Sequence, residues 1–286
     1  MEMKKKIQEL GVIGSGTMGS GIAHVSALSG FKTILIDINK ELLSKSLDSI
    51  QKNLNNQMNN NQITQTEMNL AIDKIQISTD LSQVKMCDLV IEAITEDQKI
   101  KSKLFSKLDK ICKESSILAS NTSSISISGI GESTNRPDRV IGMHFMNPVH
   151  IMKLVEVIRG KQTSKLTASK ILKISKSMNK IPIECNDSPG FLSNRILMPM
   201  INEAIFCLYE KIGSKEAIDS IMKLGMSHPM GPLALADLIG LDVCLNIINV
   251  LYSEFKDEKY MPCPLLIEMV DKGRLGKKSG QGFYNY

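Results

Sequence analysis

A glycine-rich segment near the start of the chain has the residue types and spacing of a phosphate-binding turn. Gly14, Gly16 and Gly19 form a G-x-G-x-x-G pattern that directly follows a short apolar run. The first glycine permits a tight turn, the second lets the backbone approach a pyrophosphate, and the third allows a helix to pack closely on a strand. With Thr17 and Met18, they would open a helix whose N–H groups and positive dipole end attract phosphate. The segment predicts a dinucleotide site.

A carboxylate stands where such a site needs one. The apolar run 33–36 ends in Asp37, 18 residues after Gly19. A carboxylate at this distance can accept hydrogen bonds from the adenosine ribose hydroxyls, and it repels a 2′-phosphate. The negative charge of Asp37 therefore favours NAD over NADP as cofactor, although the nearby Lys40 weakens that preference.

One histidine has the setting of a catalytic base. An enzyme that oxidises an alcohol needs a group to take the hydroxyl proton, and the pKa of histidine suits this role. His144 lies at the end of the apolar run 140–145, and ligands of open α/β sheets bind outside the carboxyl ends of strands. Glu156, in the apolar run 153–158, is costly to bury unless paired, and His144 would satisfy it. A catalytic pair and a structural buried pair both remain open. Among the other histidines, His24 is interpreted as a packing residue, His150 as an exposed loop residue and His228 as a structural turn residue.

Two polar segments could add hydrogen-bond donors for a substrate oxygen. Residues 121–124 (Asn-Thr-Ser-Ser) follow another apolar run at the same predicted sheet edge, and residues 193–195 (Ser-Asn-Arg) open a helical stretch. Helix or turn capping is the alternative interpretation of both.

The order of the elements indicates how these residues are positioned. Short β-branched runs alternate with amphipathic stretches up to about residue 187, which indicates βαβ units around a mostly parallel sheet. The polar stretch 39–73 keeps leucines at helical spacing, so it predicts a helical excursion with a turn at 59–61. The expected strands are 10–13, 33–38, 75–79, 88–94, 116–120, 140–145, 154–159 and 181–185.

The pattern changes at the Asp187-Ser188-Pro189-Gly190 turn, after which apolar residues recur mainly at helical spacing. We therefore expect a Rossmann-type doubly wound α/β domain over 1–187, followed by an all-α domain over 188–286 that serves substrate binding and dimerisation. Asp187 or Ser188 could cap the next helix. Apolar helix faces of the second domain could form a dimer contact or lie in its own core.

Composition limits the class of protein. The chain has 286 residues, 42% hydrophobic and 23% charged, as in globular proteins. No run of about 18 apolar residues predicts a membrane helix, and the basic start 1–6 lacks the apolar region of a leader, so we expect a cytoplasmic protein. The net charge of +5 suits an anionic ligand and is too small to indicate nucleic acid. Six scattered cysteines without a C-x-x-C predict reduced thiols. No His/Cys/Asp cluster has the spacing of metal ligands, so we expect no metal site.

Taken together, these motifs resemble the short-chain L-3-hydroxyacyl-CoA dehydrogenase family, which includes bacterial 3-hydroxybutyryl-CoA dehydrogenases. The resemblance covers essentially the whole chain, and the combination of motifs is highly specific. The segments that carry it are 11–19, 121–124, 144–149, 187–195, 231–237 and 279–284.

The resemblance implies a reaction and a role for each matching residue. The reaction is the NAD-dependent oxidation of (S)-3-hydroxyacyl-CoA, here 3-hydroxybutyryl-CoA, and its reverse, in fatty-acid or butyrate metabolism. His144 would be the general base, paired with Glu156, while Ser123 and Asn194 would contact the acyl substrate. The family is typically a homodimer joined through its helical domain. Residues matching family positions around NAD are Glu96, Lys101, Ser123, Asn147 and Lys278.

The chain departs from the family in the excursion after the second strand. Family members commonly carry Ser and Lys residues there that meet the CoA moiety, whereas this chain reads Asn-Leu-Asn-Asn-Gln at 53–57, with Lys45 and Lys52 nearby. We therefore expect weaker affinity for CoA.

Two other functions remain open. One is a dehydrogenase of a free hydroxy acid or sugar acid on the same scaffold, which would not require the thioester. The other is a non-catalytic NAD-binding protein. The presence of Ser123, His144, Glu156 and Asn194 argues against the second, because a protein without turnover has no physical need for all four.

Overall fold

The computed structural model describes residues 8–286, and the basic start considered above, 1–6, lies outside them. The chain divides into two compact units, 1–187 and 188–286, each of which is described by itself.

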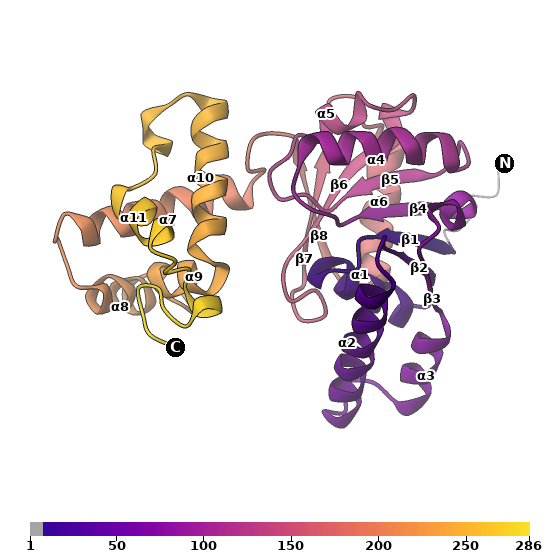
Figure 1. The fold of residues 1–286 in the computed structure, drawn as a ribbon, viewed down its shortest axis with the longest axis horizontal. Helices are drawn as coiled ribbons and strands as arrows, with labels where there is room; N and C mark the ends of the chain where they lie inside the picture. The colour runs from indigo at the N-terminus through magenta and orange to yellow at the C-terminus, as the bar shows by residue number, and fades with distance from the viewer. Residues whose placement is uncertain (1–7) are drawn as a thin grey trace. The chain divides into compact units, whose positions relative to one another are not determined.

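The first unit is built on an eight-stranded sheet in the order β3-β2-β1-β4-β5-β6-β7-β8 (Figure 1). All neighbouring strands are parallel except β6 and β7, which run antiparallel. The predicted strands are all present, and the predicted Rossmann-type sheet is confirmed. The strands are β1 (Glu9–Ile13), β2 (Lys32–Ile36), β3 (Ile75–Ser78), β4 (Leu89–Glu92), β5 (Ile117–Ser120), β6 (Val140–Phe145), β7 (Leu154–Arg159) and β8 (Ile181–Asn186).

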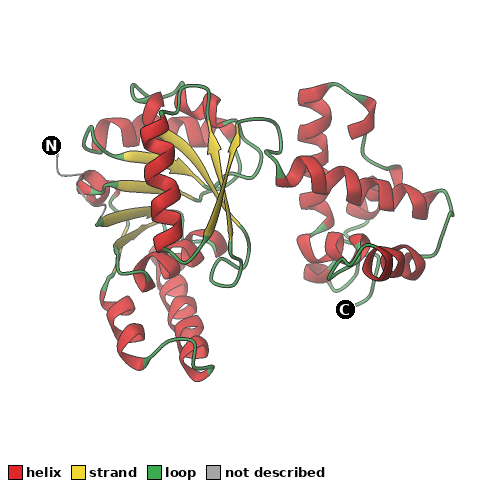
Figure 2. Ribbon diagram, turned by 180° about the vertical axis from the view of Figure 1, so that it is seen from behind, coloured by secondary structure: helices red, strands yellow, loops and turns green. Residues whose placement is uncertain are grey.

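Helices cover the sheet of the first unit (Figure 2). Strands β4, β5 and β6 are buried along their whole length, as expected for parallel strands covered on both faces. The helices are α1 (Thr17–Leu28), α2 (Lys40–Asn59), α3 (Gln65–Asp73), α4 (Gln98–Ile111), α5 (Ile127–Gly131) and α6 (Lys165–Ser177).

The predicted helical excursion is the pair α2 and α3, which extends beyond the sheet (Figure 1). The side chain of Asn39 caps α2, and Thr64 with Glu67 forms a capping box at the start of α3. The turn between the helices spans 60–64 and overlaps the predicted turn at 59–61.

The second unit is helical, as predicted. Its core is a separate cluster that includes Ile201, Leu233, Cys244 and Leu251. The helices are α7 (Ser193–Tyr209), α8 (Lys215–Gly225), α9 (Pro232–Ile239), α10 (Leu241–Phe255) and α11 (Pro264–Asp271).

The predicted cap of the first helix in this unit was wrong. The residue before α7 is Leu192, whose side chain provides no cap. Asp187 instead accepts hydrogen bonds from Ser126 Oγ and Ser128 N, both at 2.8 Å, and so stabilises the start of α5. The sequence places Asp187 only six residues before α7, whereas its actual partners lie about 60 residues away and become neighbours only in the folded sheet.

Among the described residues, no single helix is long and apolar enough to cross a membrane. By length and composition alone, α9 and α10 reach the span of a membrane only when taken together, and this pair is bent by 99°.

Candidate active site

The glycine loop has the backbone that the sequence predicts. Gly14 has a φ of 100°, and a Cβ there would lie 2.5 Å from the carbonyl oxygen of Ala93. A Cβ on Gly19 would lie 1.8 Å from the carbonyl oxygen of Gly14, so side chains are excluded at both positions. At Gly16 a Cβ would meet nothing within 4 Å, which leaves the backbone accessible from outside.

The start of α1 fits a pyrophosphate. No side chain caps this helix, and Gly16 and Thr17 are exposed while Met18 is half-buried. Unpaired N–H groups and the helix dipole at such an end attract negative charge. The glycine loop and the start of α1 therefore suit the phosphates of a dinucleotide with their side chains as they stand.

Asp37 follows β2 and lies beside this loop. One carboxylate oxygen accepts hydrogen bonds from the backbone nitrogen of Ser15 at 2.7 Å and from its hydroxyl at 2.8 Å. The other oxygen accepts the backbone N–H of Asn39 at 3.3 Å. The half-exposed carboxylate is thereby fixed next to the phosphate turn, where a ribose would lie.

His144 and Glu156 form the pair that the sequence predicts. They lie directly opposite each other in the antiparallel register of β6 and β7. His144 Nδ1 lies 2.8 Å from Glu156 Oε2, and the two side chains are 11% and 5% exposed. Because the carboxylate accepts the Nδ1–H, the neutral ring carries its lone pair on Nε2. The arrangement can take a proton at Nε2 and stabilise the resulting imidazolium.

Glu96 organises the segment that contains Ser123. One of its oxygens accepts bonds from Thr122 Oγ1 at 2.5 Å, Ser123 N at 2.9 Å and Ser123 Oγ at 3.1 Å. Burial opposes ionisation of this carboxyl, but the Lys101 ammonium and the bonds from Thr122 and Ser123 outweigh it and lower the pKa of Glu96. The ionised carboxylate fixes the loop that follows β5.

Lys101 is buried between two carboxylates. Its side chain is 1% exposed, and its ammonium lies 2.5 Å from Glu92 and 3.2 Å from Glu96. Lys101 therefore holds Glu96 in place, and its expected role at the cofactor stays a prediction.

Glu92 was missed by the sequence reasoning. It is fully buried at the end of β4, and besides Lys101 it accepts bonds from Ser120 Oγ at 2.6 Å and Ile94 N at 2.8 Å. The signal that singled out Glu156, a carboxylate in an apolar run, was also present here. Its partner Lys101 lies nine residues later in the chain, in helix α4, and no strand pattern indicates that the two side chains meet.

The loop after β6 carries Asn147, which is exposed. At the end of that strand, Asn121 Oδ1 accepts the backbone N–H of Phe145 at 2.9 Å and so ties β5 to β6. The structure thus gathers the glycine loop, Glu96, Ser123 and His144 at the carboxyl ends of the parallel strands.

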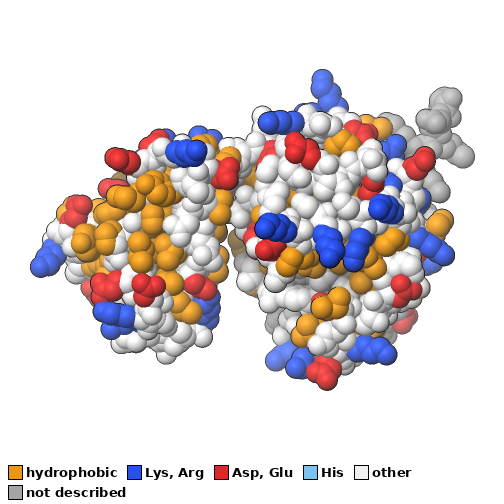
Figure 3. All heavy atoms as spheres, turned by 45° about the horizontal axis from the view of Figure 1, so that its top comes forward, with side chains coloured by type: hydrophobic (Ala, Val, Ile, Leu, Met, Phe, Trp, Pro, Cys, Tyr) orange, Lys and Arg blue, Asp and Glu red, His pale blue; other side chains and the backbone are white. Residues whose placement is uncertain are grey.

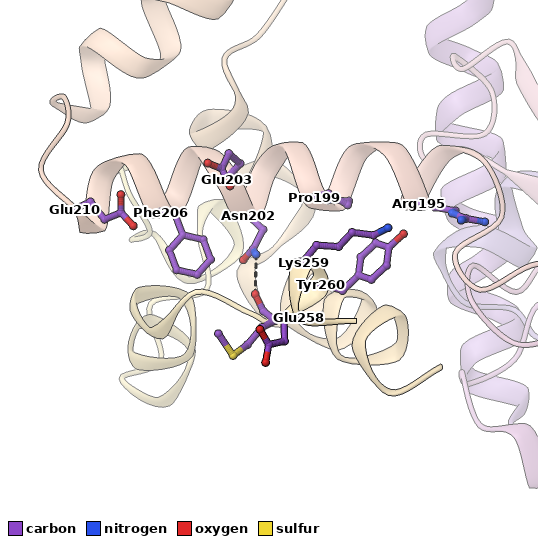
Figure 4. A pocket seen from close by; sticks show the side chains of 10 residues that line it. Arg195, Pro199, Asn202, Glu203, Phe206, Glu210, Glu258, Lys259 and Tyr260 are labelled. Carbon is purple, nitrogen blue, oxygen red and sulfur yellow. Dashed lines mark hydrogen bonds between the residues drawn. The ribbon is translucent and has the colours of Figure 1, made fainter. Parts of the chain in front are cut away.

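Two predicted site residues belong to the helical unit. Asn194 is buried near the start of α7, and Lys278 is exposed, with its ammonium 2.5 Å from Asp242. A hollow of about 660 Å³ also lies in this unit (Figure 4). It is lined by charges of both signs, among them Glu258 and Arg195, and Arg195 is the last residue of the polar segment 193–195 considered for substrate binding.

The α2–α3 excursion presents amide side chains at 53–57, where Ser and Lys residues were expected from the resemblance. Gln57 Oε1 is 2.9 Å from His24 Nε2, while Lys45 and Lys52 are exposed on α2.

His24 is a buried packing residue, as predicted, and burial lowers its pKa to about 4. The expectation for His150 was wrong: it is half-buried, because its ring stacks on His24 with centroids 5.6 Å apart.

Fold and site together define an NAD-linked oxidoreductase: a dinucleotide cradle on a mostly parallel sheet, with a histidine–carboxylate pair at the strand ends. Two family profiles match the chain. The 3-hydroxyacyl-CoA dehydrogenase NAD-binding domain matches residues 9–188, and the C-terminal domain of the same family matches residues 190–286. The chain therefore belongs to the 3-hydroxyacyl-CoA dehydrogenase family.

Individual relatives agree with this assignment over nine-tenths or more of their lengths. The chain is 50% identical to a 3-hydroxybutyryl-CoA dehydrogenase of Clostridioides difficile, over 97% of this chain and 99% of the relative. It is 42% identical to the mitochondrial hydroxyacyl-coenzyme A dehydrogenase of Homo sapiens, over 98% and 91%. The crystal structure of (S)-3-hydroxybutyryl-CoA dehydrogenase from Ralstonia eutropha matches with a TM-score of 0.95 and 47% identity, over 98% and 99%.

Proposed function

We propose that this protein oxidises (S)-3-hydroxybutyryl-CoA to acetoacetyl-CoA with NAD and catalyses the reverse reduction. The observation that carries the proposal is the 2.8 Å contact between His144 and Glu156 at the strand ends of the NAD-binding unit. The substrate is taken from full-length relatives that carry this name, at 50% and 47% identity.

The pair accounts for the proton transfer. When bound, NAD accepts a hydride from the carbon that bears the hydroxyl group. His144 takes the hydroxyl proton at Nε2, and the Glu156 carboxylate stabilises the positive ring. In the reverse direction the imidazolium returns that proton to the carbonyl oxygen. By their family positions, Ser123 and Asn194 are assigned to hold the oxygens of the acyl group with their hydrogen-bonding side chains.

The first unit supplies the cofactor contacts in this proposal. Residues of the glycine loop hold the pyrophosphate and Asp37 accepts the ribose hydroxyls. The site is completed by Glu96, Lys101, Ser123 and Asn147. The carboxylate of Asp37 disfavours a 2′-phosphate, which supports NAD over NADP. Lys278 is assigned to the cofactor only by its family position.

A homodimer through the helical unit is part of the proposal. Hydrophobic side chains gather on one face of this unit (Figure 3). Helix α8 is amphipathic, yet Ile221 and Leu224 are 63% and 84% exposed. An apolar helix face left uncovered in this way is typical of a protein–protein contact.

Oxidation of NADH followed at 340 nm tests the proposed reaction. Acetoacetyl-CoA should support rapid loss of NADH, whereas free acetoacetate should not, and NADPH should react more slowly than NADH. Tight NADH binding without turnover of the thioester would contradict the substrate. A subsequent screen of free hydroxy acids and sugar acids would then separate another dehydrogenase from a non-catalytic NAD-binding protein.

A further inference from the structure

A buried lysine lies outside the proposed chemistry. Lys180 directly precedes β8 and is 6% exposed. Its ammonium donates to the carbonyl oxygens of Val149 and Met152, the latter at 2.8 Å. Within residues 8–286 it forms no salt bridge. A buried charge held only by neutral carbonyls is costly, so its presence calls for a role.

The segment that Lys180 holds connects the two members of the catalytic pair. Residues 146–153 run from the end of β6, which carries His144, to the start of β7, which carries Glu156. Without the lysine, two carbonyl oxygens in this connection would lose their donor. The connection also carries the exposed Asn147, which the proposed function assigns to the cofactor.

The connection is packed closely against the dinucleotide helix. A Cβ on Gly21 in α1 would lie 2.8 Å from the side chain of Val149, so no larger residue fits there unless the loop moves. The backbone N–H groups of Ile151 and Met152 both donate to the carbonyl oxygen of Pro148. Lys180 thus completes a turn that is tied to α1 on one side and to the start of β8 on the other.

We propose that Lys180 is a positioning residue that fixes the 146–153 connection and thereby orients Asn147 toward the cofactor. The inference rests on the proposed function for the role of Asn147. The contacts of Lys180 itself are independent of that function.

The surroundings of Lys180 are basic, which makes its role dependent on pH. The titratable groups that face it are His24 on α1, His150 in the loop and Lys153 before β7. Burial, followed by repulsion from Lys153, lowers the pKa of Lys180 from 10.5 to about 8. Above this pH the neutral amine is a weaker donor to the two carbonyls, so the loop should loosen.

Lys180→Met tests the proposal by removing the ammonium that donates to both carbonyl oxygens, at similar side-chain length. Its matched control is Lys176→Met, an exposed lysine on α6. We expect the KM for NADH to rise about tenfold in Lys180→Met with a smaller change in kcat, since a slightly misplaced contact costs binding and orientation. Amide exchange at Ile151 and Met152 should become faster, and the control should change neither. Unchanged KM and unchanged exchange in Lys180→Met would overturn the proposal.

A pH profile supplies a second test that does not depend on the folding of Lys180→Met. In the wild type, the KM for NADH should rise above about pH 8. Lys153→Met removes the repelling charge, raises the pKa of Lys180 and should move this rise to higher pH. Lys180→Arg stays charged and should abolish the rise. An alkaline rise that is identical in all three proteins would contradict the proposal.

Failure of the proposed function can be told apart from failure of this inference. If the wild type does not turn over acetoacetyl-CoA, the proposed substrate is wrong. NADH binding measured by fluorescence, with amide exchange of residues 149–152, still decides the role of Lys180. If the wild type is active and Lys180→Met behaves like its control, the positioning role alone is wrong.

Discussion

His144 depends on a neighbour that strand register supplies. In an antiparallel pair, a shift of one residue moves every side chain to the other face of the sheet. His144 and Glu156 face each other because β6 and β7 pair in the observed register. The sequence could predict this pair, since a carboxylate in an apolar strand requires a partner and a histidine stood at the end of the preceding strand.

Replacement of His144 tests the base directly. His144→Gln keeps a polar side chain but cannot take the proton, so kcat should fall by roughly 10²–10⁴-fold. NADH affinity should stay nearly intact, because the glycine loop and Asp37 are unchanged. Turnover with acetoacetyl-CoA and NADH fluorescence measure the two effects. Glu156→Gln serves as the comparison: its amide oxygen can still accept the Nδ1–H, so a smaller fall in kcat isolates the contribution of the charge. Substantial activity in His144→Gln would remove this residue from the role of base.

Other contacts within the site could not be predicted from the sequence. The buried contact between Glu92 and Lys101 joins a strand to a helix, and no local pattern specifies it. The same holds for the bonds from Thr122 and Ser123 to Glu96, which depend on the relative positions of two loops. The family resemblance named Glu96, Lys101 and Ser123, whereas Glu92 and the contacts among these residues required the three-dimensional arrangement.

At the level of elements, repeated apolar patterns determine most of the fold. The eight strands and the α2–α3 excursion were predicted because periodicity and turn residues are local signals. The cap of α7 was predicted wrongly, because the carboxylate of Asp187 is used by α5, which is distant in sequence.

Helix α2 carries the departure from the family pattern. With amides at 53–57 in place of Ser and Lys contacts, the KM for acetoacetyl-CoA should be high. Asn56→Lys, at an exposed position of α2, should lower this KM a few-fold, and the gain should shrink with added salt because exposed charges are screened. The control is Gln51→Lys on a different face of the helix. A low micromolar KM in the wild type, unaffected by Asn56→Lys, would argue against this prediction.

An ionic contact fixes α4 to the segment before β6 and predicts acid sensitivity. Asp109 accepts bonds from Asn135 N at 2.9 Å and from Arg136 Nε at 2.6 Å. Burial opposes ionisation, but the bonds from Asn135 and Arg136 outweigh it and lower the pKa of Asp109. Because the pKa of Asp109 is lower in the folded protein than in the unfolded chain, ionised Asp109 stabilises the fold fully at pH values above the unfolded-state pKa of 3.8. This stabilisation is lost as the pH falls through the pKa of Asp109 in the folded protein.

Asp109→Asn should therefore lower the melting temperature by roughly 5 °C at pH 7, because bonds to a charged partner are lost. The difference from the wild type should shrink as the pH is lowered through the folded pKa of Asp109. Thermal unfolding followed by circular dichroism at several pH values measures both effects. Asp138→Asn, at an exposed position in the same segment, is the control. A difference that grows on acidification would contradict the assignment.

For the whole molecule, the helical unit carries an apolar surface that its own core does not use. That core is formed largely by α7, α9, α10 and α11, while Asp219 is the buried residue of α8. Asp219 accepts the backbone N–H of Leu233 at 2.8 Å and the Tyr284 hydroxyl at 3.0 Å. These polar contacts and the packing of Ile218 against the core hold α8 in place. Its exposed Ile221 and Leu224 remain available to a second copy of the chain.

Charge placed on that helix tests the dimer. Ile221→Glu combined with Leu224→Glu should convert a dimer into a monomer, because two desolvated carboxylates cannot be accommodated in an apolar contact. Light scattering after size-exclusion chromatography measures the mass, against 31.6 kDa for one chain. The control is Lys223→Glu, at an exposed position of the same helix. It changes the charge of α8 but leaves the apolar side chains of Ile221 and Leu224 in place, so it should leave the dimer intact. Both substituted positions are exposed within the single chain, so the double variant should keep its melting profile except for the loss of stabilisation by the partner. A monomeric wild type would exclude the dimer, and a dimer that survives the double substitution would place the contact on another face of the helical unit.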